Sequence, residues 1–148
     1  MSELRQKAIA LLARREHTRA ELIRKLAPHG TKDDIDLVIA ALQTSQLQSD
    51  ARFAGAYLRS NAARFGPARL RQTLRQKGVD AETMAAEIEA AELPDEMTQV
   101  RAVWARKFSA APADAKEWGK QARFLQTRGF SSDAIRRLLK DPVGDNEE

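Results

Sequence analysis

The stretch GPARLRQTLRQKGV, residues 66–79, contains the signals of a complete short helix. Pro67 stands at a first helical position, where its fixed φ is tolerated, and Gly78 follows where a left-handed residue commonly ends a helix. Leu70 and Leu74 lie one turn apart on one face, and every charged residue of the stretch is basic. These residues predict a helix with one apolar stripe and one basic face.

The pattern occurs twice more, in ELIRKLAPHG at 21–30 and QARFLQTRG at 121–129. The closing glycines, Gly30 and Gly129, lie 48 residues before and 51 residues after Gly78. A leucine stands four residues before each glycine. Eight residues before the glycine, the first two copies have another leucine and the third has glutamine. The residues concerned are Leu26, Leu74 and Leu125, then Leu22, Leu70 and Gln121.

Amphipathic segments with a spacing of three or four residues flank each of these helices, and no alternation typical of strands competes with them. The sequence therefore predicts an all-α fold: an elongated, curved array of three tandem three-helix repeats that resemble helix-turn-helix units. Chance regularity of helix length is the alternative explanation. The expected boundaries are 1–48, 49–94 and 95–141 for the repeats, followed by an acidic flexible tail at 142–148.

Start signals support these helices. Thr18 with Glu21, and Asp114 with Glu117, have the spacing of capping boxes. The further candidate N-caps are Thr31, Asp80 and either Ser131 or Ser132.

Composition limits the class of protein. The chain has no cysteine, so disulfides and thiolate metal sites are excluded. Its apolar runs, such as AIALLA at 8–13, are far shorter than a membrane span, and its first residues lack the pattern of a signal peptide. We expect a cytoplasmic protein without membrane contact.

Signals for chemistry are sparse. His17 and His29 lack the spacing of a metal site, and we interpret them as a turn residue and a helix-end residue. No phosphate-binding glycine loop or nucleophile elbow occurs. We therefore expect no catalytic residue, metal or cofactor. The aromatic residues fall mainly at core spacing and are interpreted as packing: Phe53, Tyr57, Trp104, Phe108, Trp118 and Phe124.

Charge is strongly segregated along the chain. Residues 51–79 carry seven bases and no acid, and residues 80–99 carry seven acids and no base. Residues 101–140 carry ten bases against three acids. Neighbouring helices of opposite charge would neutralise one another; the alternative, which we favour, is a basic face that binds a polyanion or an acidic partner.

The bases of residues 51–79 are the preferred candidates for that face, because no acid lies near them in sequence and arginine binds phosphate or carboxylate with two hydrogen bonds. They are Arg52, Arg59, Arg64, Arg69, Arg71, Arg75 and Lys77. A secondary cluster, diluted by Glu16 and Glu21, consists of Arg14, Arg15, Arg19, Arg24 and Lys25.

Three blocks of the chain, in order, resemble the RecX family, the bacterial regulators of the RecA recombinase. They are ALLARREHTRAELIRKL at 10–26, LQSDARFAGAYLRSNAARFGPARLRQTLRQKGV at 47–79 and RFLQTRGFSSDAIRRLL at 123–139. The resemblance implies a curved array of three three-helix repeats and a non-enzymatic protein.

The resemblance also implies a function. It is binding to the RecA filament on single-stranded DNA, with limits on filament growth, ATP hydrolysis, strand exchange and cleavage of the SOS repressor. We expect a monomer whose basic face meets acidic RecA side chains or filament DNA, with weak direct DNA binding as a further expectation.

Two other readings stay open. The first is a helix-turn-helix-like nucleic-acid-binding protein that acts without RecA. The second is a scaffold of helical repeats that binds a peptide or protein alone.

Overall fold

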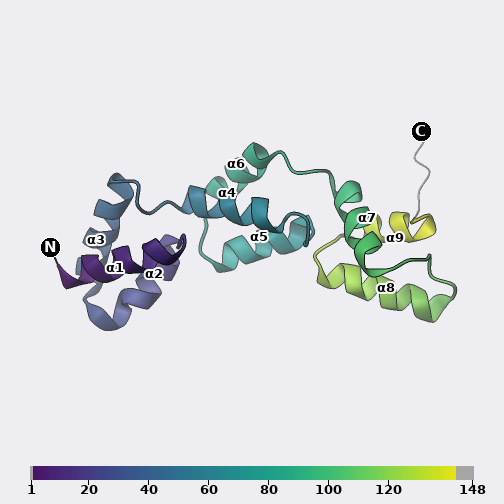
Figure 1. Ribbon diagram of the computed structural model, residues 1–148, viewed down its shortest axis with the longest axis horizontal. Coiled ribbons are helices and arrows are strands. Elements are labelled where there is room, and N and C mark those ends of the chain that lie inside the picture. The colour runs from purple at the N-terminus through teal and green to yellow at the C-terminus, as the bar shows by residue number, and fades with distance from the viewer. Residues whose placement is uncertain (1, 143–148) are drawn as a thin grey trace. The chain divides into compact units, whose positions relative to one another are not determined.

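The computed structural model describes residues 2–142 of the chain, and in that range all regular structure is helical (Figure 1). The all-α prediction is confirmed. The predicted acidic tail falls, apart from Pro142, on residues 143–148, outside the described range. The helices are α1 (Glu3–Arg14), α2 (Arg19–Leu26), the 3₁₀ turn η1 (Ala27–His29), α3 (Lys32–Thr44), α4 (Asp50–Asn61), α5 (Pro67–Gln76), α6 (Ala81–Ala91), α7 (Glu96–Lys107), α8 (Ala115–Thr127) and α9 (Ser132–Lys140).

The predicted N-caps begin these helices. Thr18 and Glu21 form a complete capping box on α2, because the threonine hydroxyl accepts from the Glu21 N–H and the glutamate accepts from the Thr18 N–H. Asp114 caps α8 by accepting from the Glu117 N–H at 2.8 Å. Of the two serines considered for α9, Ser131 is the cap. Each cap satisfies a backbone N–H that the first turn of a helix leaves without a partner.

The chain forms two compact units. Unit 1 takes the chain up to Tyr57 together with Leu74–Ala91, and unit 2 takes Leu58–Thr73 together with the chain from Glu92 onward. Helices α4 and α5 therefore each contribute residues to both units. The three-helix repeats expected from the sequence are α1–α3, α4–α6 and α7–α9, so the units do not coincide with the repeats.

Each unit has its own apolar cluster. In unit 1 the buried side chains come from α1, α2 and α3 and are Leu4, Ala8, Leu22, Leu26, Ile35, Ile39 and Leu42. In unit 2 they come mainly from α7, α8 and α9 and are Val100, Val103, Trp104, Leu125, Phe130, Ala134, Ile135, Leu138 and Leu139. Both clusters follow the helical spacing of the sequence, and burial of this apolar surface is the main force that holds the helices together.

A close joint links the first repeat to the second within unit 1. The Thr18 hydroxyl, at the start of α2, donates to the Lys77 carbonyl at 2.6 Å. The next residue, Gly78, has a φ of +93°. A Cβ there would lie 2.5 Å from Cβ of Ala20. Glycine is therefore required both by the backbone and by the close approach of the second helix of the preceding repeat.

Unit 2 repeats this joint between the second repeat and the third. The Gly66 N–H, at the start of α5, donates to the Arg128 carbonyl at 2.7 Å. Gly129 follows with a φ of +99°, and a Cβ there would lie 2.6 Å from the backbone nitrogen of Arg69. In both joints a helix start binds the carbonyl that precedes a glycine. Gly30, which lies in the first repeat, is extended instead, with φ at −171°.

Trp118 corrects one expectation from the sequence. It was interpreted as a core residue, but 39% of its surface is exposed. It lies one or two turns from the buried Gln121 and Leu125 on the same face of α8. The first turns of α8 extend past the apolar cluster of unit 2, so helical spacing alone predicts burial there wrongly.

The helices of the described range are also too short or too polar to pass through a lipid bilayer.

Candidate partner-binding surface

Helix α5 carries the centre of the predicted basic face. Its apolar stripe is as expected, because Leu70 and Leu74 are both buried. Arg71 and Arg75 lie one turn apart on the exposed side. Within residues 2–142 neither guanidinium makes an ion pair or a side-chain hydrogen bond, and the same holds for the exposed Arg59 on α4. These three arginines keep their full hydrogen-bonding capacity for a partner.

Two of the predicted surface residues have acidic partners in unit 1 that lie far from them in sequence. Arg52 forms an ion pair with Glu16 and also donates to the carbonyls of Gln46 and Leu47. Lys77 lies 3.3 Å from Glu21. Their positive charges are therefore partly neutralised by the first repeat.

Arg64 and Arg69 gather around one aromatic ring in unit 2. The guanidinium carbons lie 5.1 Å and 4.2 Å from the centre of the Phe65 ring. Arg69 also donates to the carbonyl of Thr127 at 3.1 Å. Cation–π contacts orient a guanidinium without neutralising it, so both residues remain positive at the surface.

The structure divides the seven bases between its two units. Unit 2 contains Arg59, Arg64, Arg69 and Arg71, and unit 1 contains Arg52, Arg75 and Lys77.

The secondary basic cluster in unit 1 is largely engaged. Arg15 binds both carboxylate oxygens of Glu21, at 3.2 Å and 3.3 Å. Arg19 pairs with Asp36, and Lys25 Nζ lies 3.0 Å from His17 Nε2. The remaining members of the cluster are the exposed Arg14 and Arg24.

Glu21 is the polar centre of unit 1. Burial raises its pKa, but hydrogen bonds from Arg15, the Thr18 N–H and Lys77 outweigh that effect and lower the pKa to about 2. Only 1% of its side chain is exposed. The carboxylate is therefore ionised at neutral pH and holds residues from the first and second repeats together.

His17 lies beside this carboxylate and is 1% exposed. Burial lowers its pKa and the charges of Arg15 and Lys25 act in the same direction, while the hydrogen bond to the Arg15 carbonyl and the charge of Glu21 oppose them. A neutral ring with its proton on Nδ1 fits the contacts, because it donates to the Arg15 carbonyl and accepts from Lys25. His17 is thus a buried structural histidine, more deeply placed than the turn residue expected from the sequence.

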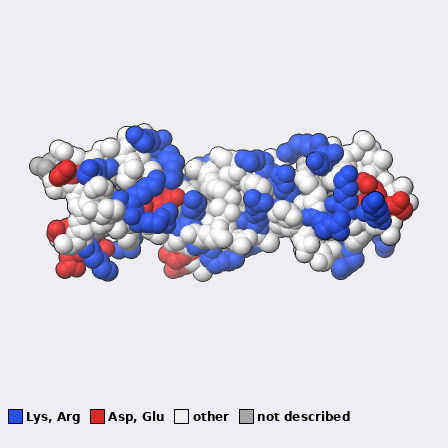
Figure 2. All heavy atoms as spheres, turned by 90° about the horizontal axis from the view of Figure 1, so that it is seen from below, with Lys and Arg blue, Asp and Glu red and all other residues white. Residues whose placement is uncertain are grey.

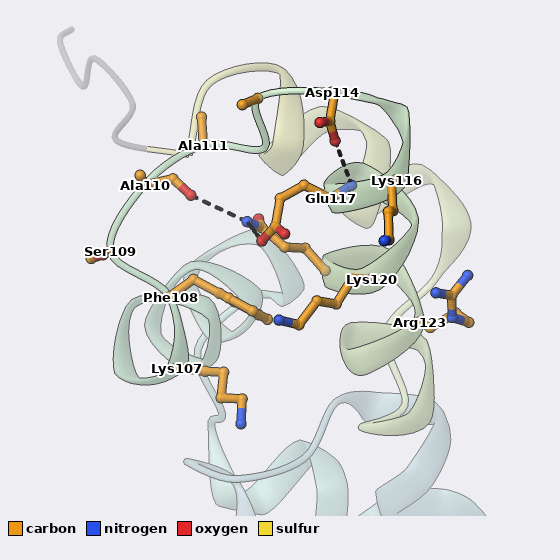
Figure 3. A pocket seen from close by; sticks show the side chains of 12 residues that line it. Lys107, Phe108, Ser109, Ala110, Ala111, Asp114, Lys116, Glu117, Lys120 and Arg123 are labelled. Carbon is orange, nitrogen blue, oxygen red and sulfur yellow. Dashed lines mark hydrogen bonds between the residues drawn. The ribbon is translucent and has the colours of Figure 1, made fainter.

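Unit 2 contains a second basic site whose residues were not singled out from the sequence. Lys107, Lys116, Lys120 and Arg123 line a groove where α7 ends and α8 begins (Figure 3). On the face shown in Figure 2, lysine and arginine side chains cover much of the surface at the C-terminal end. The excess of bases in residues 101–140 was the available signal, but its spread over forty residues hid the clustering.

No three histidine or acidic side chains of residues 2–142 are grouped so that they could hold a metal ion.

Comparison with protein families gives three matches along the chain. Residues 5–42 match "RecX, first three-helix domain", residues 49–87 match the second three-helix domain and residues 95–139 match the third. The three sets of three helices therefore correspond to three tandem three-helix domains of one family.

Curated relatives cover nearly the whole chain. The "Regulatory protein RecX" of Leptothrix cholodnii is 44% identical over 138 residues, which span 93% of this chain and 87% of that protein. The "Regulatory protein RecX" of Chromobacterium violaceum is 42% identical over 144 residues, which span 97% of this chain and 93% of that protein.

Solved structures have the same fold. The crystal structure of RecX from Lactobacillus salivarius matches with a TM-score of 0.77 at 22% identity and covers 95% of both chains. A crystal structure of a regulatory protein RecX matches with a TM-score of 0.76 over 94% of this chain and 74% of that one, also at 22% identity.

Proposed function

The chain belongs to the RecX family, and from that premise we propose that it regulates the RecA recombinase, mainly as a negative modulator. It binds the RecA filament on single-stranded DNA. By doing so it limits filament growth, ATP hydrolysis, strand exchange and cleavage of the SOS repressor. Its relatives are named regulatory proteins, which supports a non-enzymatic role; we propose a cytoplasmic monomer that uses no cofactor.

The observation that carries this proposal is the set of exposed arginines without an internal partner. Arg71 and Arg75 form a pair on α5, and Arg59 lies on α4. A guanidinium in water loses side-chain freedom and hydration on binding, and two parallel hydrogen bonds to a carboxylate or phosphate compensate for this. Such groups suit acidic side chains of a RecA filament and the phosphates of its DNA.

The other members of the basic face have different roles in this proposal. Arg52 and Lys77 hold the first and second repeats together through Glu16 and Glu21. Arg64 and Arg69, oriented by Phe65, supplement the free arginines. We therefore rank Arg59, Arg71 and Arg75 above the remaining four as contact residues.

The decisive experiment is single-strand-dependent ATP hydrolysis by RecA from the same organism, with this protein added below one copy per RecA. We expect suppression at these ratios. Arg71→Ala with Arg75→Ala should weaken suppression, whereas the control Arg136→Ala with Arg137→Ala, on the exposed side of α9, should retain it. No suppression at equimolar protein and low salt would refute the regulatory proposal and favour nucleic-acid binding without RecA.

A further inference from the structure

Each repeat has a corner where its first helix ends and its second helix begins, and in the first repeat the next repeat covers this corner. Gln48 donates to the His17 carbonyl at 3.2 Å, and the Thr18 hydroxyl donates to the Lys77 carbonyl. The corner of the first repeat is therefore covered by Gln48, the last residue of that repeat, and by Lys77 of the second repeat.

The second repeat is covered in the same way. Gln99 donates to the Ala62 carbonyl at 3.3 Å, and the Arg128 carbonyl accepts from the Gly66 N–H. Within unit 2, chain from the third repeat fills this corner.

In the third repeat the equivalent corner is an open groove of about 740 Å³ (Figure 3). All of its lining residues come from the end of α7, the loop that follows it and the first turns of α8, within residues 107–123. Among the described residues, the corner that binds a neighbouring repeat in the first two repeats is thus left open as a groove in the third.

The rim of this groove is cationic. Lys116, Lys120 and Arg123 lie on α8 at positions i, i+4 and i+7, about 6 and 4.5 Å apart along the helix axis. In the described part of the chain none of the three forms an ion pair or a side-chain hydrogen bond. Their charges form an unneutralised row along one side of the groove.

The two acids of the groove have internal roles. Asp114 caps the first turn of α8 by accepting from the Glu117 N–H. The Glu117 carboxylate accepts from the side-chain amide of the buried Gln121 at 3.1 Å. They lie at one end of the groove, away from Lys107 at the other (Figure 3).

An aromatic ring lies beside the cations. Phe108 lines the groove and is only partly buried. Its ring packs edge-on against Phe124, with ring centres 5.4 Å apart. Lys120 extends across the groove toward it (Figure 3). Cations next to an accessible aromatic ring are the combination with which proteins bind single-stranded nucleic acid.

We propose that this groove binds a single strand of nucleic acid. Lys116, Lys120 and Arg123 bind successive phosphates, and one base lies against Phe108. A duplex would keep its bases stacked inside and leave Phe108 without a ligand, whereas an acidic peptide would occupy the cations but offer the ring no flat apolar surface. The site acts without RecA, so it goes beyond the function proposed above.

The test is fluorescence anisotropy of a labelled oligothymidylate of about 15 nucleotides, bound by the full chain at several salt concentrations. Lys116→Gln, Lys120→Gln and Arg123→Gln together should weaken binding about tenfold or more at low salt. They should also flatten the plot of log affinity against log salt by about two units, since each lost phosphate contact removes about 0.7. The matched control removes the same charge from α9: Arg136→Gln, Arg137→Gln and Lys140→Gln.

Phe108→Leu gives an independent readout. It should weaken oligothymidylate binding about fivefold or more without changing the salt slope, because stacking is lost and no phosphate contact is lost. Circular dichroism checks that this variant folds. If it does not fold, the charge variants still test the proposal.

Unchanged affinity and slope in the α8 variant, or equal losses in the α9 control, would overturn the proposal. Poly-L-glutamate is also added as a competitor at matched charge. If it displaces the oligothymidylate as well as unlabelled oligothymidylate does, and Phe108→Leu has no effect, the ligand of the groove is an acidic protein segment and the proposal of a single strand is wrong. Suppression of RecA ATP hydrolysis is measured on the same variants. A wild-type chain that suppresses RecA but fails to bind the oligonucleotide would refute the groove and leave the regulatory function standing.

Discussion

Trp104 donates its indole N–H to the side-chain oxygen of Gln121 at 2.8 Å, and both residues are buried in unit 2. The amide nitrogen of Gln121 in turn donates to the Ala110 carbonyl at 3.2 Å. Leucine occupies the equivalent position in the first two repeats. The third repeat needs glutamine because a buried indole N–H without an acceptor is costly.

Replacing this glutamine by the leucine of the other repeats should destabilise the protein. Gln121→Leu leaves the Trp104 N–H and the Ala110 carbonyl unpaired, so we expect a loss of about 1–3 kcal/mol in the free energy of unfolding. Urea denaturation followed by tryptophan fluorescence measures it. Gln126→Leu, at an exposed position on the same helix, is the control and should change stability by less than about 0.5 kcal/mol. Equal losses in the two variants would contradict this assignment.

Of three glycines, the two in the joints should not tolerate alanine, whereas the third, inside α8, should. Gly78→Ala and Gly129→Ala combine a positive φ with a close contact, and each should lower the free energy of unfolding by about 2–4 kcal/mol. Gly119 lies inside α8, where a Cβ would meet only the flexible tip of Arg123 at 3.2 Å. Gly119→Ala should therefore be neutral or stabilise by up to about 1 kcal/mol. Thermal unfolding of the three variants orders them directly.

The buried carboxylate of Glu21 predicts a pH-dependent contribution to stability. Its pKa is lowered from 4.5 to about 2 in the folded chain. An acid whose pKa is lower in the folded than in the unfolded chain stabilises the fold at pH values above its unfolded pKa. This contribution is therefore complete above about pH 5 and is lost as the pH falls toward 2.

Glu21→Gln tests this contribution. We expect a loss of about 2 kcal/mol at pH 7, since Arg15 and Lys77 are themselves about half exposed and screened by solvent. The difference from the wild type should shrink between pH 5 and pH 2. Denaturant unfolding at several pH values measures it, and a difference that is independent of pH would be inconsistent with the ion pairs.

The bases of the predicted face separate into two classes by stability. Arg52→Ala removes an ion pair and two hydrogen bonds to carbonyls, and should cost about 1 kcal/mol of stability in unit 1. Arg71→Ala and Arg75→Ala remove no internal contact and should leave the thermal midpoint unchanged. A drop in midpoint for the α5 pair would show that these arginines stabilise the fold, and would weaken their assignment to a partner.

Signals from residues close together in the sequence predicted much of the fold. Helical spacing, N-caps such as Thr18 and Asp114, and the recurrence of Gly78 and Gly129 are all properties of neighbouring residues, and the structure confirms them. Trp118 departs from its spacing because burial depends on where the neighbouring helices end.

The candidate site was less accessible to sequence reasoning. Arg52 forms an ion pair with Glu16, 36 residues away in sequence, and Lys77 forms one with Glu21, 56 residues away. A search for acids close in sequence therefore overlooks both pairs. The groove of unit 2 was missed for a related reason. Lys107 and the α8 cations meet only because the chain turns between two helices, and a count of charges along the sequence does not register that turn.

The joints give the chain a connector with two unlike ends. One end is a helix start that donates a hydrogen bond, and the other is a carbonyl, followed by glycine, that accepts one; the middle repeat carries both, at Gly66 and at Lys77–Gly78. A tandem duplication of residues 49–94 would therefore supply its own matching connectors. The joint between the two copies would pair Gly66 of one with Lys77–Gly78 of the other, so lengthening the protein by one repeat requires one new pairing but no new kind of connector.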